Sequence, residues 1–260
     1  SHELPLRAGG RNGVVLAAPR ERKYECWITA LDVFLDGSWV SASRNGFLRC
    51  QDISGRRSFY AGFPPCSAST RPEAYKARNL NRIMSIFCLK NPSSRHQFHC
   101  LIGYTESFCQ FDLTDKKVVR AFDFRASQWV YGFCPVSRDV IATIHGANLS
   151  LLREVRQGGR DTWEIIGRVV EKPRVPPGEQ IPFISSIFPM RVGLELSATV
   201  SAVTLSYFGG RTEVRDVERR TVIHYGHEHT GRVWQAVPFM PYCYASCADD
   251  RTIKIWDARL

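Results

Sequence analysis

The chain has 260 residues, of which 44% are hydrophobic and 23% charged. This composition is close to that of ordinary globular domains, so it excludes a wholly disordered chain and, at this length, favours one domain over 1–260. The formal net charge of +10 favours acidic partners such as nucleic acid or phosphorylated peptides, and it equally suits a basic surface with no selected partner.

Membrane and metal sites have no support in the sequence. No apolar run approaches the roughly 18 residues that span a bilayer, and the first residues show no charged-then-apolar signal segment. The nine cysteines are an odd number, most lie in apolar strand-like runs, and none forms a Cys-x-x-Cys pair. Cys243 and Cys247 would stand roughly 13 Å apart on a strand. We therefore expect free buried thiols, no metal, and a location in the cytoplasm or nucleus.

Internal repetition is the main signal along the chain. In the first unit, over about 28–61, Asp36-Gly37 and Asn45-Gly46 separate apolar runs, which is a strong indication of β-hairpins. The predicted strands of this unit are Ile28–Phe34, Ser38–Ser43, Phe47–Asp52 and Arg57–Ala61. Residues 62–80 contain three prolines and no alternation, so we expect an inserted surface loop there.

Three further units follow with the same pattern, over about 82–122, 128–170 and 181–225. In the third unit a polar stretch at 156–160 is predicted to separate the last two strands. The Pro-rich residues 171–180 are predicted to form a second inserted loop. In the fourth unit the second strand is either 202–208 or an extended stretch at 192–200.

The last unit, 228–259, contains three β-type runs joined by tight turns and closes on Trp256-Asp257. This unit resembles one repeat of the WD-repeat β-propeller family, through His229, Ser246, Asp250 and Trp256. In that family such residues form a buried hydrogen-bond chain, so the resemblance implies a structural role for all four and no catalytic one. Gly226-His227 competes with His229 for the histidine position.

The resemblance implies an all-β propeller of four-stranded antiparallel blades, of which five repeats are recognisable. The last repeat supplies only three strands, and family members commonly close the ring with an N-terminal strand. Here 13–17 or 22–27, within the N-terminal segment 1–27, are the candidates. The family usually has seven blades. Either the blade number is unusual, or a degenerate blade lies near 57–81 or 190–201, or sequence beyond these residues supplies part of the ring.

Catalytic chemistry has no positive signal, because no phosphate loop, zinc spacing or nucleophile motif is present. We therefore expect no enzyme, no catalytic residue and no cofactor. By analogy with the family, the predicted function is a protein-protein interaction platform, as a monomeric propeller within a larger protein or complex.

Two alternative partners have their own candidate residues. The Trp-Asp-x-Arg ending is similar to that of substrate receptors of cullin-type ubiquitin ligases, in which the arginine helps to dock the adaptor, so Asp257 and Arg259 are the candidates here. Nucleic acid or another phosphate-bearing partner would need basic residues on one surface. The candidates for that surface are Arg71, Lys76, Arg78, Arg82, Arg211 and Arg215.

Overall fold

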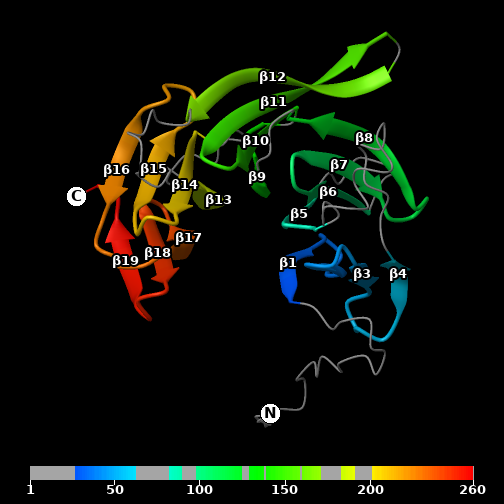
Figure 1. Cartoon of the computed structure of the whole chain (residues 1–260), viewed down its shortest axis with the longest axis horizontal. Coiled ribbons are helices and arrows are strands. Elements are labelled where there is room, and N and C mark those ends of the chain that lie inside the picture. The colour runs from blue at the N-terminus through cyan, green and yellow to red at the C-terminus, as the bar shows by residue number, and fades with distance from the viewer. Residues whose placement is uncertain are drawn as a thin grey trace.

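The fold is built from β-strands alone within the residues that the structure, a computed structural model, describes. These residues are 27–62, 82–89, 98–124, 129–137, 139–158, 160–170, 183–190 and 201–259. Their strands form five antiparallel sheets arranged as the blades of a propeller around a common axis (Figure 1). The predicted all-β propeller and its five repeats are confirmed.

Each of the first four blades consists of four strands that are neighbours in both sequence and space. Blade 1 contains β1 (Ile28–Val33), β2 (Trp39–Ser43), β3 (Leu48–Gln51) and β4 (Ser58–Gly62). Blade 2 contains β5 (Ser85–Cys88), β6 (His99–Gly103), β7 (Ser107–Asp112) and β8 (Lys117–Asp123). Blade 3 contains β9 (Val130–Pro135), β10 (Val140–His145), β11 (Asn148–Gln157) and β12 (Arg160–Val170). Blade 4 contains β13 (Ile184–Met190), β14 (Ala202–Tyr207), β15 (Thr212–Asp216) and β16 (Val222–Gly226).

Blade 5 contains three described strands, β17 (Val233–Met240), β18 (Cys243–Ala248) and β19 (Ile253–Asp257). The candidate closing strands at 13–17 and 22–27 lie outside the described residues, apart from Trp27, so closure by an N-terminal strand stays a prediction. The predicted loops at 62–80 and 171–180 also lie outside them, apart from Gly62 at the end of β4.

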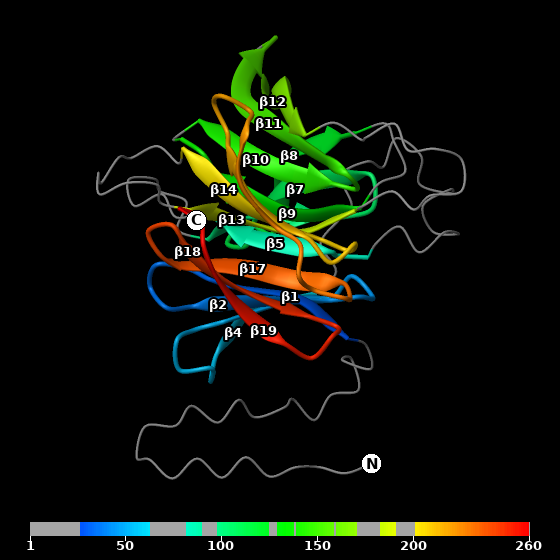
Figure 2. The same ribbon diagram turned by 90° about the vertical axis from the view of Figure 1, so that its left-hand side faces the viewer.

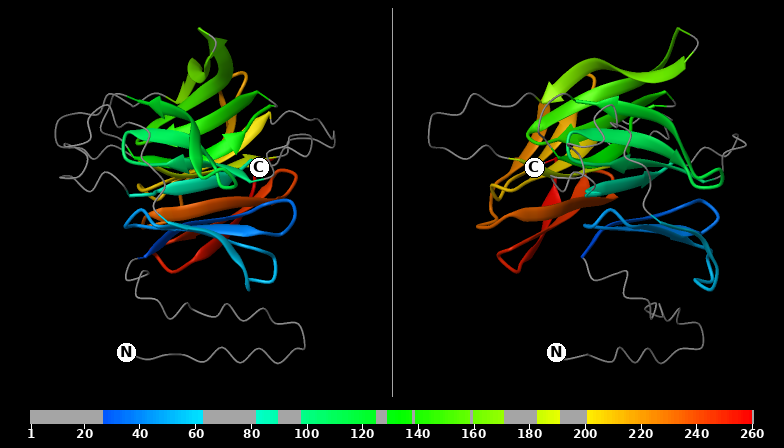
Figure 3. Two further views of the ribbon diagram at one scale, coloured as in Figure 1. Left: turned by 90° about the vertical axis from the view of Figure 1, so that its right-hand side faces the viewer. Right: turned by 45° about the vertical axis from the view of Figure 1, so that its right-hand side comes forward.

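The long hairpin of blade 3 differs from the sequence prediction. The break between the last two strands falls within the predicted stretch 156–160 but is shorter, since β11 continues to Gln157 and pairs with Arg160 at the start of β12. This hairpin extends past the other strands of its blade (Figures 1 and 3). Backbone hydrogen bonds form whatever the side chains are, so polar residues can extend β11 and β12 beyond the apolar run. In blade 4 the second strand is Ala202–Tyr207, one of the two predicted alternatives.

Apolar clusters join each blade to the next one in the chain. Blades 1 and 2 share a core around Leu48 and Phe111, and blades 2 and 3 share one around Phe108 and Trp163. The other two lie between blades 3 and 4, around Leu149 and Leu205, and between blades 4 and 5, around Val214, Tyr244 and Trp256. Burial of these side chains is the main stabilising contribution to the ring.

No such cluster joins blade 5 to blade 1 among the described residues. Large apolar side chains stay exposed on both of these blades, with Leu31 at 63%, Ile253 at 75% and Ile255 at 67%. Figure 2 views the molecule from the side on which β17, β18 and β19 lie. The described part of the chain contains no helix long and apolar enough to cross a membrane.

Candidate functional site

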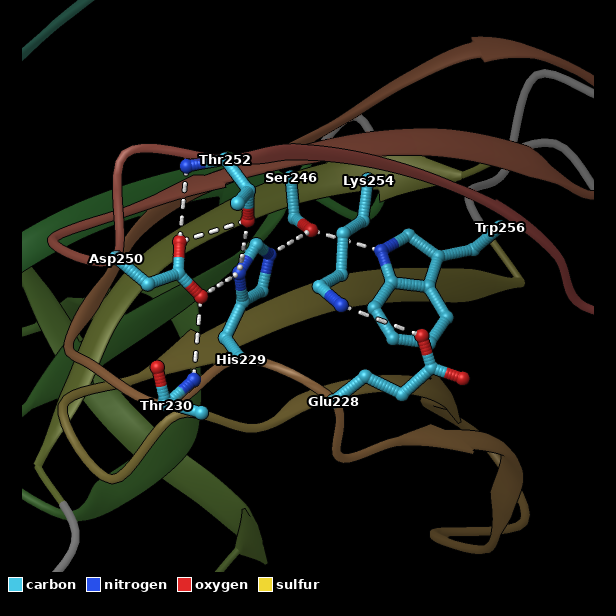
Figure 4. Close-up of polar contacts among 8 residues, drawn as sticks. All are labelled: Glu228, His229, Thr230, Ser246, Asp250, Thr252, Lys254 and Trp256. Carbon is cyan, nitrogen blue, oxygen red and sulfur yellow. Dashed lines mark hydrogen bonds and ion pairs between the residues drawn. The ribbon is translucent and has the colours of Figure 1, made fainter.

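The four residues that carry the family resemblance come together in blade 5 (Figure 4). The indole N–H of Trp256 donates to the hydroxyl oxygen of Ser246 at 2.7 Å, and that oxygen lies 2.7 Å from Nε2 of His229. The other ring nitrogen of His229, Nδ1, lies 2.7 Å from Oδ2 of Asp250. Because a carboxylate only accepts, we assign the imidazole proton to Nδ1, and Nε2 then accepts from the Ser246 hydroxyl. This chain of hydrogen bonds ties the segment before β17 to β18 and β19.

Asp250 is held as an anion by several donors at once. Its carboxylate accepts hydrogen bonds from the Thr252 hydroxyl at 2.7 Å, the Thr252 N–H at 3.0 Å and the Thr230 N–H at 3.1 Å. Burial acts to raise the pKa of Asp250. The hydrogen bonds from Thr252, His229 and Thr230 outweigh it and hold that pKa well below its usual range.

The competing histidine lies elsewhere. His227 is exposed and its ring stacks on Tyr225 at 6.1 Å between centroids, whereas His229 is 4% exposed. Ser246 is 1% exposed, so its hydroxyl cannot reach a substrate in solution. Gly226, which precedes His227, has a packing role: a Cβ at this position would lie 2.7 Å from the Trp256 ring. The arrangement is suited to holding strands together and not to nucleophilic chemistry.

Asp257 is the last residue of β19, and Arg259 lies two residues beyond it and pairs with it. The Arg259 Nε–H donates to Oδ1 of Asp257 at 2.8 Å, and 61% of the arginine side chain is exposed. These hydrogen bonds from Arg259 are the main cause that lowers the pKa of Asp257 to about 2. The guanidinium is accessible but already paired, and adaptor docking stays a prediction.

The candidate basic surface is not assembled by the described residues. Arg211 and Arg215 turn toward Glu213, which is 3% exposed, at N–O distances of 3.5 and 3.1 Å. The Tyr207 hydroxyl also donates to Glu213, at 2.8 Å. Arg82 precedes β5 and is half-buried, and Arg71, Lys76 and Arg78 lie outside the described residues. The prediction of a basic partner surface therefore stays a prediction, with the charges of two of its members compensated by one buried carboxylate.

A set of aromatic side chains was missed by the sequence reasoning. In four blades one residue, which we call the pre-strand residue, stands just before the innermost strand and its carbonyl accepts an N–H from the turn between the second and third strands. These hydrogen bonds are Arg44 to Trp27 at 2.8 Å, Gly146 to Trp129 at 3.0 Å, Phe208 to Phe183 at 2.9 Å and Asp249 to Arg232 at 2.9 Å. The three aromatic pre-strand residues, Trp27, Trp129 and Phe183, are 77%, 39% and 40% exposed.

The signal for these residues was present in the sequence. Each of them precedes an apolar residue at the start of an innermost strand, Ile28, Val130 or Ile184, and alignment of the repeats on their hairpins would have placed them at one position. A single repeat does not show this, because one exposed aromatic side chain is common on any protein surface.

No group of three or more His, Cys, Asp or Glu side chains in the described ranges could hold a metal ion. The described cysteines Cys50, Cys100 and Cys134 are buried, and burial raises the pKa of each thiol well above its usual value. Such thiols are poor nucleophiles and poor metal ligands.

Comparison with known proteins agrees with this geometry. Residues 219–257 match the family model described as WD domain, G-beta repeat. Among solved structures, the β-propeller domain of Cps50 (Swd1) from Myceliophteria thermophila is similar, with 16% sequence identity and a TM-score of 0.56. The match covers 88% of this chain and 64% of that domain, so this chain spans less than two thirds of its relative. At this identity the likeness shows the fold alone. No curated protein matches the chain.

Proposed function

We propose, from the premise that the chain is a β-propeller of the WD40-repeat type, that it is a non-catalytic platform that binds other proteins. Propellers of this family commonly serve as interaction scaffolds and are usually not enzymes. Because one fold hosts many functions, the proposal depends on the surface of this particular chain.

The observation that carries the proposal is the repeated exposure of aromatic pre-strand residues. Trp27, Trp129 and Phe183 occupy one structural position in three blades and keep 39% or more of their surface in water. Exposed aromatic side chains that gather on one surface mark interaction sites, and tryptophan is enriched among the residues that dominate binding energy. The buried hydrogen-bond chain of blade 5 holds the strands of that blade together beneath such a surface.

The test is co-purification of the chain from cells at about 0.15 M salt, after nuclease treatment. We expect a protein partner to be retained. A double variant, Trp129→Ser with Phe183→Ser, should lose that partner while the chain stays folded, as checked by circular dichroism. The matched control is Val119→Ser with Ile166→Ser, two exposed apolar residues on the outermost strands β8 and β12, which should retain it.

Two other outcomes would replace the proposal. Loss of every partner on nuclease treatment would favour nucleic acid as the ligand, since polyanion binding by a chain of charge +10 needs no protein-specific surface. Retention of a cullin adaptor that depends on Arg259 would favour the narrower role of a substrate-recognition subunit of a ubiquitin ligase.

A further inference from the structure

Six side chains from blades 3, 4 and 5 form one connected surface patch, which we call the Arg232 patch. Phe208 is its centre, with ring centroids at 5.7 Å from Tyr131, 6.4 Å from Phe183 and 6.3 Å from Trp234. Trp129 extends the patch through its contact with Tyr131 at 5.8 Å. The remaining member is Arg232, whose guanidinium carbon lies 4.2 Å from the centroid of Phe208 and 4.9 Å from that of Trp234.

Arg232 is the pre-strand residue of blade 5, at the position that carries an aromatic side chain in blades 1, 3 and 4. It is exposed, and among the described residues no carboxylate forms an ion pair with it. Arg211 and Arg215 of blade 4 differ in this respect, because both pair with Glu213. The patch therefore presents an uncompensated cation within an aromatic surface.

The patch is ordered by contacts of its own before any ligand arrives. The indole N–H of Trp234, 48% exposed, donates to Oδ1 of Asp249 at 2.6 Å, which fixes the orientation of the ring. The Arg232 guanidinium lies over the rings of Phe208 and Trp234, which restricts its movement, while the side chain stays exposed. Burial raises the pKa of Tyr131 to about 12, so its hydroxyl stays neutral and does not compete for the arginine as an anion.

A planar guanidinium with available N–H donors makes paired hydrogen bonds to a carboxylate, and stacking holds it in the geometry that such pairing needs. Exposed Trp129 and Phe183 offer apolar surface to a side chain beside that carboxylate. A phosphate backbone would instead need a row of cations. Arg232 is the one cation of the patch.

We propose that the Arg232 patch binds an acidic peptide segment in which Asp or Glu lies within two residues of an aromatic or aliphatic side chain. The carboxylate pairs with Arg232 and the apolar side chain packs on Phe183 and Trp129. This inference rests on the proposed platform function and names the chemistry of its partner.

The test uses a displayed library of random 12-residue peptides selected on the folded chain. We expect the selected sequences to be enriched in an acidic residue next to an aromatic or aliphatic one. The affinity of the strongest synthetic peptide is then measured by fluorescence anisotropy for three variants. Arg232→Gln should weaken binding by about 10- to 100-fold, because a hydrogen-bonded charge pair is lost. Arg232→Lys should recover only part of it, since lysine keeps the charge without the planar fork.

The matched control is Arg259→Gln, which removes an exposed arginine of the same blade that is already paired with Asp257 and should leave peptide affinity unchanged. All variants should melt at the parent temperature, because both arginine side chains are exposed. A 20-nucleotide oligo-dT should not displace the peptide at about 0.15 M salt.

The proposal is overturned if the library yields no binder, if the selected peptides lack acidic residues, if Arg232→Gln leaves affinity unchanged, or if oligo-dT displaces the peptide. Its failure can be told apart from failure of the platform function. A cellular protein that is lost with Trp129→Ser and Phe183→Ser but retained with Arg232→Gln would leave the platform in place and remove the acidic anchor.

Discussion

Two buried histidines of this propeller make the same first contact and lie in opposite electrostatic surroundings. In blade 5, Nε2 of His229 lies 2.7 Å from the Ser246 hydroxyl, and Nδ1 lies 2.7 Å from the carboxylate of Asp250. In blade 3, Nε2 of His145 lies 2.9 Å from the Ser150 hydroxyl, and its ring stacks on Phe124 at 4.1 Å between centroids.

The difference shows that a buried histidine can serve two distinct structural roles. His229 is one link of a polar chain that continues to Trp256 and crosses three segments of its blade. His145 fills a core position as a polar ring that must stay neutral. Burial first, and then the positive charge of Arg168, lower the pKa of His145 to about 4. Only the first arrangement follows a recognisable sequence signature.

The largest expected effect on stability comes from removal of Trp256, at the end of the buried hydrogen-bond chain of blade 5. Trp256 is 9% exposed, and its indole packs against Tyr244 and donates to Ser246. Trp256→Ala should lower the free energy of unfolding by about 3 to 5 kcal/mol, since it leaves a cavity and removes the buried hydrogen bond to the Ser246 hydroxyl. Urea unfolding measured by tryptophan fluorescence and circular dichroism tests this.

Trp234→Ala is the matched control for that variant, because it deletes the same side chain from the same blade at a position that is 48% exposed. We expect it to cost about 1 kcal/mol or less. Equal losses of unfolding free energy in the two variants would contradict a stabilising role for the buried hydrogen-bond chain of blade 5.

The second effect concerns His145 and the pH dependence of stability. An unfolded histidine has a pKa near 6.5, and that of His145 is lowered to about 4 in the fold. Between these values the unfolded chain binds more protons, so stability is fully present above about pH 6.5 and is lost as pH falls toward 4. The contribution of His145 to this loss is on the order of 2 to 3 kcal/mol.

The measurement is the free energy of unfolding at steps between pH 7 and pH 4.5, above the range in which most carboxylates titrate. His145→Gln keeps a polar group near Ser150 and should flatten the pH dependence, whatever it costs at pH 7. His227→Gln, at an exposed histidine, should leave the slope unchanged. A slope in His145→Gln equal to that of the parent would show that another group causes the pH dependence.

Local turn chemistry explains why so much of the fold could be predicted. Gly37 and Gly46 adopt φ values of 81° and 88°, which favour glycine, so the hairpins around them placed the strands of blade 1 to within about a residue. The blade 5 chain was predicted through family resemblance. Its residues lie on β18, on β19, in the turn between them and in the segment before β17, all within one repeat.

The remaining contacts depend on how blades are placed relative to one another. Alternation along a strand places Glu213 and Arg215 on one face of β15, with Arg211 at the same spacing just before the strand. It does not show that Glu213 is buried and pairs with both arginines. The Arg232 patch combines side chains of three blades, which no repeat taken alone can show. The length of the β11–β12 hairpin was missed because its outer residues are polar on both faces.

The smallest expected effect on stability concerns Arg259, at the end of blade 5 and outside its buried hydrogen-bond chain. Arg259 lies two residues beyond Asp257, outside the polar chain, and both side chains reach solvent. Because exposed ion pairs contribute little to stability, Arg259→Glu should shift the melting temperature by at most about 2 °C.

If the chain is a substrate receptor of a ubiquitin ligase, the same variant should abolish co-purification of the cullin adaptor, since a docking guanidinium is replaced by a carboxylate beside Asp257. Arg219→Glu, an exposed charge reversal in the β15–β16 turn of blade 4, is the matched control and should keep the adaptor. Equal recovery of the adaptor with all three proteins would exclude a docking role for Arg259, and a large fall in the melting temperature would instead make Arg259 part of the blade 5 framework.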